Sequence, residues 1–222
     1  MSSTLPNPEQ AIKDALSAPR IGTYEAATTG TPQLLSALAL YAWNAQVSAS
    51  MLAPLHFCEV SIRNAVSDAI AAAHGPRWPW DAGFMRSLPN PTNGYNARRD
   101  LMSARAGKAT PGKVIPDLKF VFWQTIFTKR FDARLWAHHL RTVLPNSDTS
   151  KTVEQVRALV YSELEQLRKL RNRIAHHEPI FKRNLADDFQ KVHDLIAIRC
   201  PITAAWMVQN QQAQALIATK PP

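Results

Sequence analysis

Apolar residues recur at helical spacing along most of this chain, and alternating runs typical of strands are missing. Between Leu34 and Ile70 apolar side chains return every three or four residues, which describes one face of an α-helix. Thr31-Pro32 stands before this stretch and is typical of a helix start, because proline fits the first turn. Pro54 lies within the stretch and is expected to kink or split the helix. The pattern predicts an all-α fold.

A second long helix is predicted over residues 153–175. The apolar positions that define it are Val153, Val156, Val160, Leu164, Leu167 and Ile174. Ser150 or Thr152 is placed to cap the first turn of this helix. Because Pro179 disfavours helical geometry at the residue before it, we expect the helix to end near His176.

Shorter helices and a connecting loop complete the expected fold. The shorter helices are expected over residues 8–17, 118–126, 131–142, 181–200 and 206–218, with a loop from residue 18 to residue 30. With 222 residues the chain is long enough for one domain with a full core. The predicted organisation is a tail and short helix over 1–30, a helical domain over 31–200 with an insertion at 75–116, and a short helix and tail over 201–222.

The insertion at residues 75–116 differs in composition from the rest of the chain. It holds five of the seven glycines and six of the sixteen prolines. It also holds seven Lys and Arg residues against two Asp, which gives +5 of the total net charge of +9. This composition predicts a long irregular loop with a short basic helix over residues 96–106.

Basic side chains mixed with aromatic ones suit single-stranded RNA, whose bases stack on rings and whose phosphates meet cations. The candidate RNA-binding residues are Arg98, Arg99, Arg105 and Lys108. The alternative interpretation of this stretch is a solvated insertion. The pI of about 9.9 also favours a polyanionic partner, although basic charge can serve solubility alone.

Several other classes of protein are disfavoured by the sequence. Residues 26–58 carry no charged side chain, but Asn44, Gln46 and Ser48 interrupt the apolar run, so a buried helix is expected there and no membrane span. The first ten residues lack the layout of a signal peptide. Cys58 and Cys200 are far apart and are expected to be buried free thiols in a reducing cytoplasm. Neither a metal site nor a cofactor is predicted, since the paired histidines lack further ligands at suitable spacing.

The end of the helix over 153–175 carries the residues with the clearest chemistry. Arg171 and Asn172 are followed, after three residues, by His176. Histidine can act as a general base or acid near neutral pH, and a guanidinium can bind phosphate oxygens. Arg171 also falls four residues after Leu167 and three before Ile174, so it is expected on the apolar face, where it must pair or meet a partner.

Other polar residues could assist this chemistry. Arg173 and His177 are adjacent candidates, and Glu59 with Arg63 forms an i, i+4 pair that is either core-facing or a surface ion pair. Arginine and histidine at a helix end are also commonly stabilised there by the helix dipole. The residues alone therefore leave a structural role and a catalytic role open.

Three segments of this chain resemble the HEPN superfamily, and within it the Abi-like branch of bacterial abortive-infection proteins. They are Glu59 to Asn64, Phe122 to Pro145 and Arg171 to Phe181, where Arg171-Asn172 and His176 match the superfamily's short motif. The resemblance implies a HEPN-like helical bundle and a metal-independent endoribonuclease active in phage defence or as a toxin.

The resemblance also implies partners and roles. Two protomers would bring their motifs together in a composite site, with His176 as base or acid, Arg171 on the phosphate and Asn172 orienting. RNA would be the substrate, and an antitoxin or a phage-derived trigger would control activity. Glu178 stands where some HEPN toxins carry a tyrosine that is adenylylated, so that mode of control is not expected here. The alternative function is a non-catalytic HEPN scaffold that binds RNA or nucleotides.

Overall fold

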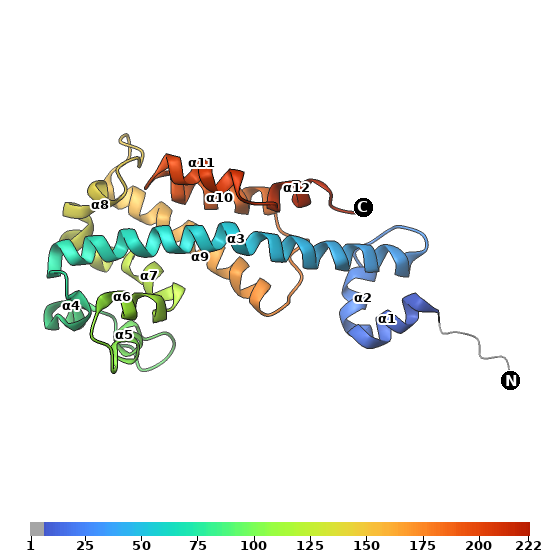
Figure 1. The fold of residues 1–222 in the computed structure, drawn as a ribbon, viewed down its shortest axis with the longest axis horizontal. Coiled ribbons are helices and arrows are strands. Elements are labelled where there is room, and N and C mark those ends of the chain that lie inside the picture. The colour runs from blue at the N-terminus through green and yellow to red at the C-terminus, as the bar shows by residue number, and fades with distance from the viewer. Residues whose placement is uncertain (1–6) are drawn as a thin grey trace.

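The computed structural model describes residues 7–222, and every regular element in that range is helical (Figure 1). The all-α prediction is therefore confirmed. The α-helices are α1 (Pro8–Leu16), α2 (Ala18–Glu25), α3 (Gln33–His74), α4 (Ala82–Ser87), α5 (Ala97–Arg105), α6 (Pro111–Val114), α7 (Phe120–Ile126), α8 (Ala137–Val143), α9 (Val153–Ala175), α10 (Leu185–Ala197), α11 (Pro201–Gln209) and α12 (Ala213–Ala218). Four short turns are the 3₁₀ segments η1 (Trp78–Trp80), η2 (Ile115–Asp117) and η3 (Lys129–Phe131) and the π-helical segment η4 (Asp132–Trp136).

Helix α3 is the axis of the molecule and runs along its whole length (Figure 1). It has 42 residues and contains the buried Pro54 in its interior, so of the expected kink or split at this proline the split does not occur. Proline inside a helix costs about 3 kcal/mol. Helix α3 offsets this cost because α2, α10 and α12 pack along it and bury side chains on several of its faces. Other positions of α3, among them Leu35 and Leu52, remain exposed.

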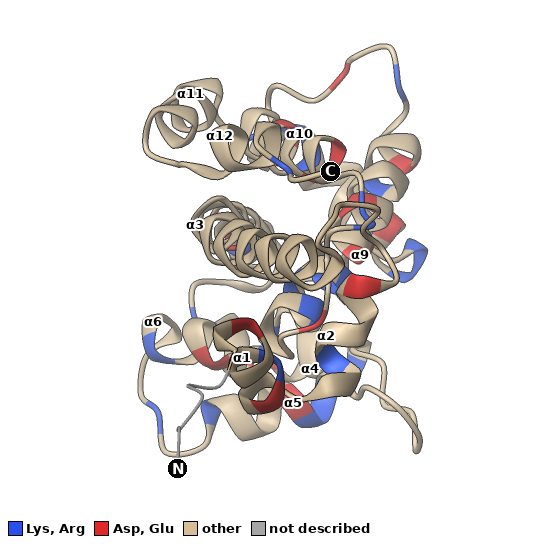
Figure 2. Ribbon diagram, turned by 90° about the vertical axis from the view of Figure 1, so that its right-hand side faces the viewer, with Lys and Arg blue, Asp and Glu red and all other residues tan. Residues whose placement is uncertain are grey.

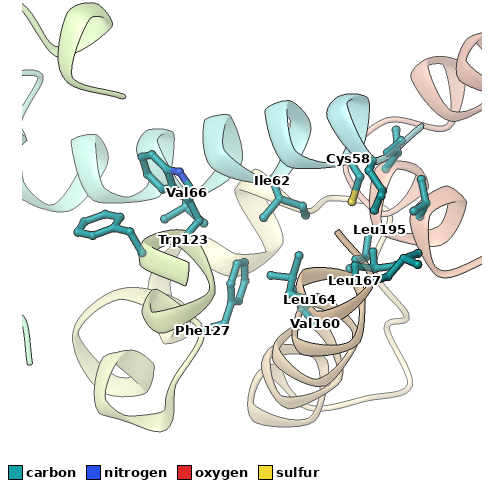
Figure 3. Close-up of a cluster of buried hydrophobic side chains, with 14 of the residues drawn as sticks. Cys58, Ile62, Val66, Trp123, Phe127, Val160, Leu164, Leu167 and Leu195 are labelled. Carbon is teal, nitrogen blue, oxygen red and sulfur yellow. The ribbon is translucent and has the colours of Figure 1, made fainter. Parts of the chain in front are cut away.

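The core lies where α3 meets α9, α10 and α7. Figure 3 shows these side chains converging from the four helices. The labelled members of the cluster are Cys58, Ile62, Val66, Trp123, Phe127, Val160, Leu164, Leu167 and Leu195. One continuous cluster of buried residues extends from Ile21 to Ala213, so the predicted N-terminal and C-terminal segments both contribute to it.

The segment 75–116 is folded, which corrects the expectation of an irregular loop. It forms η1, α4, α5, α6 and η2, and buries Trp78, Phe84 and Leu101 in the common core. The ring centroids of Trp78 and Trp123 lie 6.3 Å apart. Prolines occupy first turns of η1 and α6, where their missing N–H costs little. The expected short basic helix is present as α5, and Asn96 caps it by accepting the Arg99 N–H at 2.8 Å.

Other boundaries also differ from expectation. Helix α2 occupies much of the predicted loop 18–30, and two helices, α11 and α12, replace the single one predicted near the C-terminus. Helix α10 begins at Leu185, because Asn184 caps it by accepting the Asp187 N–H. Both cysteines are free thiols as expected, but only Cys58 is buried, and Cys200 is half-exposed. No helix among residues 7–222 combines the length and apolarity that crossing a bilayer requires.

Glu163, where α9 packs on α10, should make the stability of the protein depend on pH. Burial first, and then the charges of Asp194 and Asp187, raise the pKa of Glu163 from 4.5 to about 7, while Lys191 opposes the shift. The Glu163 carboxyl group therefore binds its proton more tightly in the folded state than in the unfolded state. The free energy of unfolding should fall as the pH rises from about 4.5 to about 7.

Glu163→Gln should remove this part of the pH dependence. Above pH 7 the variant should exceed the wild type by about 1 kcal/mol, a value reduced for solvent screening of a half-buried group. Urea denaturation at pH 5 and pH 8 measures both effects. Parallel curves for the two proteins across this range would contradict the assignment.

Candidate active site at the end of helix α9

Helix α9 has defined ends that place the Arg171–His176 motif at its C-terminus. Thr152 and Gln155 form a capping box, with the Gln155 N–H donating to Thr152 Oγ1 at 3.3 Å and the Thr152 N–H donating to Gln155 Oε1 at 2.8 Å. The helix ends at Ala175, with His176 as the C-cap. The predicted Thr152 cap and the predicted end near His176 are both confirmed.

The chain leaves α9 through a Schellman motif. The Glu178 N–H donates to the Arg173 carbonyl at 2.8 Å, and the His177 N–H donates to the Ile174 carbonyl at 3.0 Å. His177 has a φ of 55°, in the left-handed region that glycine usually fills at this position. His176 has φ −93° and ψ 10°, the bridge region in which many active-site residues lie. Pro179 then prevents the helix from continuing.

Arg171 and His176 are both exposed, whereas Asn172 and Arg173 are half-buried. The expectation that Arg171 lies on the buried face is wrong for the single chain, because Leu170 occupies that position and is fully buried. Neither the Arg171 nor the His176 side chain makes a hydrogen bond or an ion pair within residues 7–222. Both are therefore available to a ligand or to a second chain.

Two long-range hydrogen bonds hold the chain segment that follows α9. Arg20 on α2 donates from Nη1 to the His177 carbonyl at 2.9 Å. Asn44 on α3 accepts the buried Ile180 N–H at Oδ1, at 2.8 Å. Arg20 and Asn44 were not identified from the sequence, because they lie more than a hundred residues before the motif and no local pattern marks them.

Asn44→Ala should destabilise the protein by about 1–3 kcal/mol, because it leaves the buried Ile180 N–H without an acceptor. Asn64→Ala is the matched control, since Asn64 lies on the same helix but is exposed. Thermal unfolding of the two variants measures the difference. Equal melting temperatures would show that Asn44 does not hold the end of α9.

A small cavity of about 120 Å³ borders His177 and Glu178. Its wall includes Tyr24, which is 1% exposed and whose hydroxyl is buried without a hydrogen-bond partner. Burial, together with the nearby Tyr41, raises the pKa of Tyr24 to about 12, so the hydroxyl is a neutral donor. Arg20 also lines this space. The cavity therefore offers polar groups beside the motif that the sequence did not reveal.

The surroundings of the motif are predominantly basic. Besides Arg171, the side chains of Arg20 and Lys220 reach this region through hydrogen bonds to the His177 and Phe181 carbonyls. The one nearby carboxylate on the exit turn, Glu178, lies 3.3 Å from Arg173 Nε. A polyanion would meet net positive charge here.

The predicted auxiliary and RNA-binding residues lie elsewhere in the fold. Several Lys and Arg lie around α4 and α5, while α11 and α12 carry no charge (Figure 2). Three of the four predicted RNA contacts are engaged within the chain: Arg98 donates to the Arg86 and Leu88 carbonyls, Arg105 to the Pro79 carbonyl, and Lys108 pairs with Asp117. Arg99 is exposed beside a cavity of about 700 Å³.

Glu59 and Arg63 do not form the ion pair that their spacing suggested. Both are half-buried, no ion pair joins them in the described part of the chain, and Arg63 Nε is buried without a partner. They lie on α3, and nothing in their contacts links them to His176. Their auxiliary role stays a prediction.

Residues 7–222 contain no group of three or more His, Cys, Asp or Glu side chains arranged to hold a metal ion. The side chains of the motif itself are a guanidinium, an amide and an imidazole. No family model, curated protein or solved structure matches this chain.

Proposed function

We propose that this chain is a metal-independent endoribonuclease of the HEPN type, acting in phage defence or as a toxin. The observation that carries the proposal is the placement of Arg171, Asn172 and His176 at one helix end. Arg171 and His176 are exposed, and neither side chain has a hydrogen-bond or ion-pair partner among residues 7–222. The basic surroundings suit an RNA backbone. RNA is the substrate in this proposal, the site of action is the cytoplasm, and an antitoxin or a phage-derived trigger controls the activity.

The reaction we propose is attack of the ribose 2′-oxygen on the adjacent phosphorus. A base removes the 2′-hydroxyl proton, the new P–O2′ bond forms, the P–O5′ bond breaks, and an acid protonates the leaving 5′-oxygen. The products are a 2′,3′-cyclic phosphate and a 5′-hydroxyl. His176 acts as base or acid, Arg171 stabilises the charge on the phosphorane, and Asn172 orients these groups.

One chain presents a single motif histidine, whereas this reaction uses both a base and an acid. A second protomer that brings its own α9 end to the first supplies the missing group. The exposure of Arg171 and His176 is compatible with such a composite site. Arg173 and His177 serve as auxiliary groups in this arrangement, although the His177 backbone already has a structural role in the Schellman motif.

The test is incubation of the purified protein with a mixed RNA pool in EDTA, followed by end-group analysis of the products. Fragments ending in a 2′,3′-cyclic phosphate and beginning with a 5′-hydroxyl are expected. Size-exclusion chromatography with light scattering should show a dimer under the same conditions. Cleavage that requires a divalent metal, or binding of RNA without cleavage by the dimer, would contradict the proposal, and the second result would favour the scaffold function.

A further inference from the structure

A third cavity lies at the far end of α3, away from the motif at the end of α9. It has a volume of about 390 Å³ and is bordered by the end of α3, α4, η3 and η4. Its polar lining residues are His74, Arg86, Ser87, Arg130 and Arg134, and its apolar ones include Phe84 and Phe131. Asn44 and His74 stand roughly thirty residues apart on one helix, so this cavity is roughly 45 Å along α3 from the exit of α9.

The three arginines leave uncompensated positive charge at this cavity. The Arg86 and Arg134 side chains make no hydrogen bond or ion pair among the described residues. Arg130 donates from Nε to the Ser87 carbonyl at 2.6 Å, and its terminal nitrogens have no partner in the part of the chain that the structure describes. All three are exposed at the rim, where a ligand can reach them.

The neighbouring carboxylates are already paired and do not cancel this charge. Asp132 forms a two-pronged pair with Arg157, at 2.9 Å and 3.2 Å. Asp81 lies 3.0 Å from His74 Nδ1, and its carboxylate also accepts the Phe84 N–H, which lowers the pKa of Asp81. Both carboxylates are therefore engaged by groups other than the three arginines.

The backbone that presents Arg134 has an unusual geometry. Arg134 lies in the π-helical segment η4, which closes with the Ala137 N–H donating to the Asp132 carbonyl. Such segments are rare and occur frequently at functional sites. Phe84 is 1% exposed and Phe131 is 4% exposed, so the floor of the cavity is closely packed and these rings offer a ligand little surface. The groups that a ligand would meet in this cavity are therefore mainly the arginine side chains at its rim.

We propose that this cavity binds a small phosphorylated molecule through the guanidinium groups of Arg86, Arg130 and Arg134. Guanidinium groups bind phosphate through paired, charge-assisted hydrogen bonds, and three of them favour a multiply charged phosphate group. The volume lies within the range of about 300–1,000 Å³ for small-ligand sites. This proposal rests on the residues that line the cavity and does not depend on ribonuclease activity at the end of α9.

Calorimetric titration of the full-length protein, without divalent cations, tests this site with ATP, pyrophosphate and adenosine. ATP and pyrophosphate should both bind, because each carries adjacent phosphate groups, and adenosine, which carries none, should bind far more weakly than either. The double variant Arg86→Gln/Arg134→Gln should lower the affinity for ATP at least tenfold. Both positions are exposed, so folding should be preserved, and thermal unfolding verifies this.

The matched control is Lys113→Gln/Lys151→Gln, which removes the same charge from exposed positions outside the cavity. It should bind ATP as the wild type does. Equal losses in the two double variants would overturn the proposal, because they would indicate general electrostatic attraction. Absence of ATP and pyrophosphate binding up to about 1 mM would overturn it too, as would binding of a short single-stranded RNA through Arg86 and Arg134 without binding of ATP or pyrophosphate.

Discussion

Replacing His176 with alanine should reduce the rate of RNA cleavage by about 10²–10⁴-fold, the usual contribution of a general acid or base. The loss should not come from unfolding. The His176 side chain is exposed and unpaired in the described chain, and its backbone N–H, which donates to the Asn172 carbonyl at 2.9 Å, is kept by alanine. Single-turnover cleavage of a defined RNA, with thermal unfolding of the same samples, separates the two effects.

His138→Ala is the control for this substitution. His138 is equally exposed but lies on α8. The His138→Ala variant should cleave RNA at the wild-type rate. If wild type and His176→Ala cleave at the same rate, the reaction occurs at another site or comes from a contaminant, and the assignment of His176 fails.

Arg183→Met should lower the free energy of unfolding by about 3–5 kcal/mol, the usual cost of leaving one member of a buried ion pair without its partner. Asp188 is 2% exposed and accepts two hydrogen bonds from Arg183, at 2.8 Å and 2.6 Å. These hydrogen bonds raise the pKa of Arg183. The pair also joins the turn after α9 to the first turn of α10, so its loss should loosen the candidate site.

Two further variants identify the cause of this destabilisation. Arg183→Met/Asp188→Leu removes both charges and should recover most of the lost stability, because a buried pair can often be replaced by apolar side chains at little cost. Lys191→Met breaks the pair with the exposed Asp187 and should change stability by at most about 1 kcal/mol. Urea denaturation of the three variants measures these differences. A double variant as unstable as Arg183→Met would show that packing, and not the unpaired carboxylate, sets the cost.

The sequence by itself determined the elements whose signals are local. The spacing of apolar residues, the Thr152 cap and Pro179 were sufficient to predict α9 and its end near His176, because helix periodicity, capping and proline geometry all act within a few residues. The all-α class followed from the same periodicity. The motif was visible in the sequence because its three residues lie within one turn and a half of one helix.

Local sequence patterns gave wrong predictions where only tertiary packing decides which residues are buried. Arg171 and Leu170 both fit the spacing of the α9 face, and only the packing of α9 against α3 and α10 buries Leu170 and leaves Arg171 exposed. The glycines and prolines of 75–116 suggested a loop. Instead they form the turns of a folded segment whose Trp78 and Phe84 pack into the common core.

Only the tertiary structure placed side chains from distant parts of the chain together. Arg20 and Asn44 reach the exit of α9 from α2 and α3, and Arg86 meets Arg130 and Arg134 at the end of α3. Such neighbours depend on how helices pack, which is determined by side-chain fit over the whole core. Periodicity along the chain indicates which face of a helix is buried, but it does not identify the helix that covers this face.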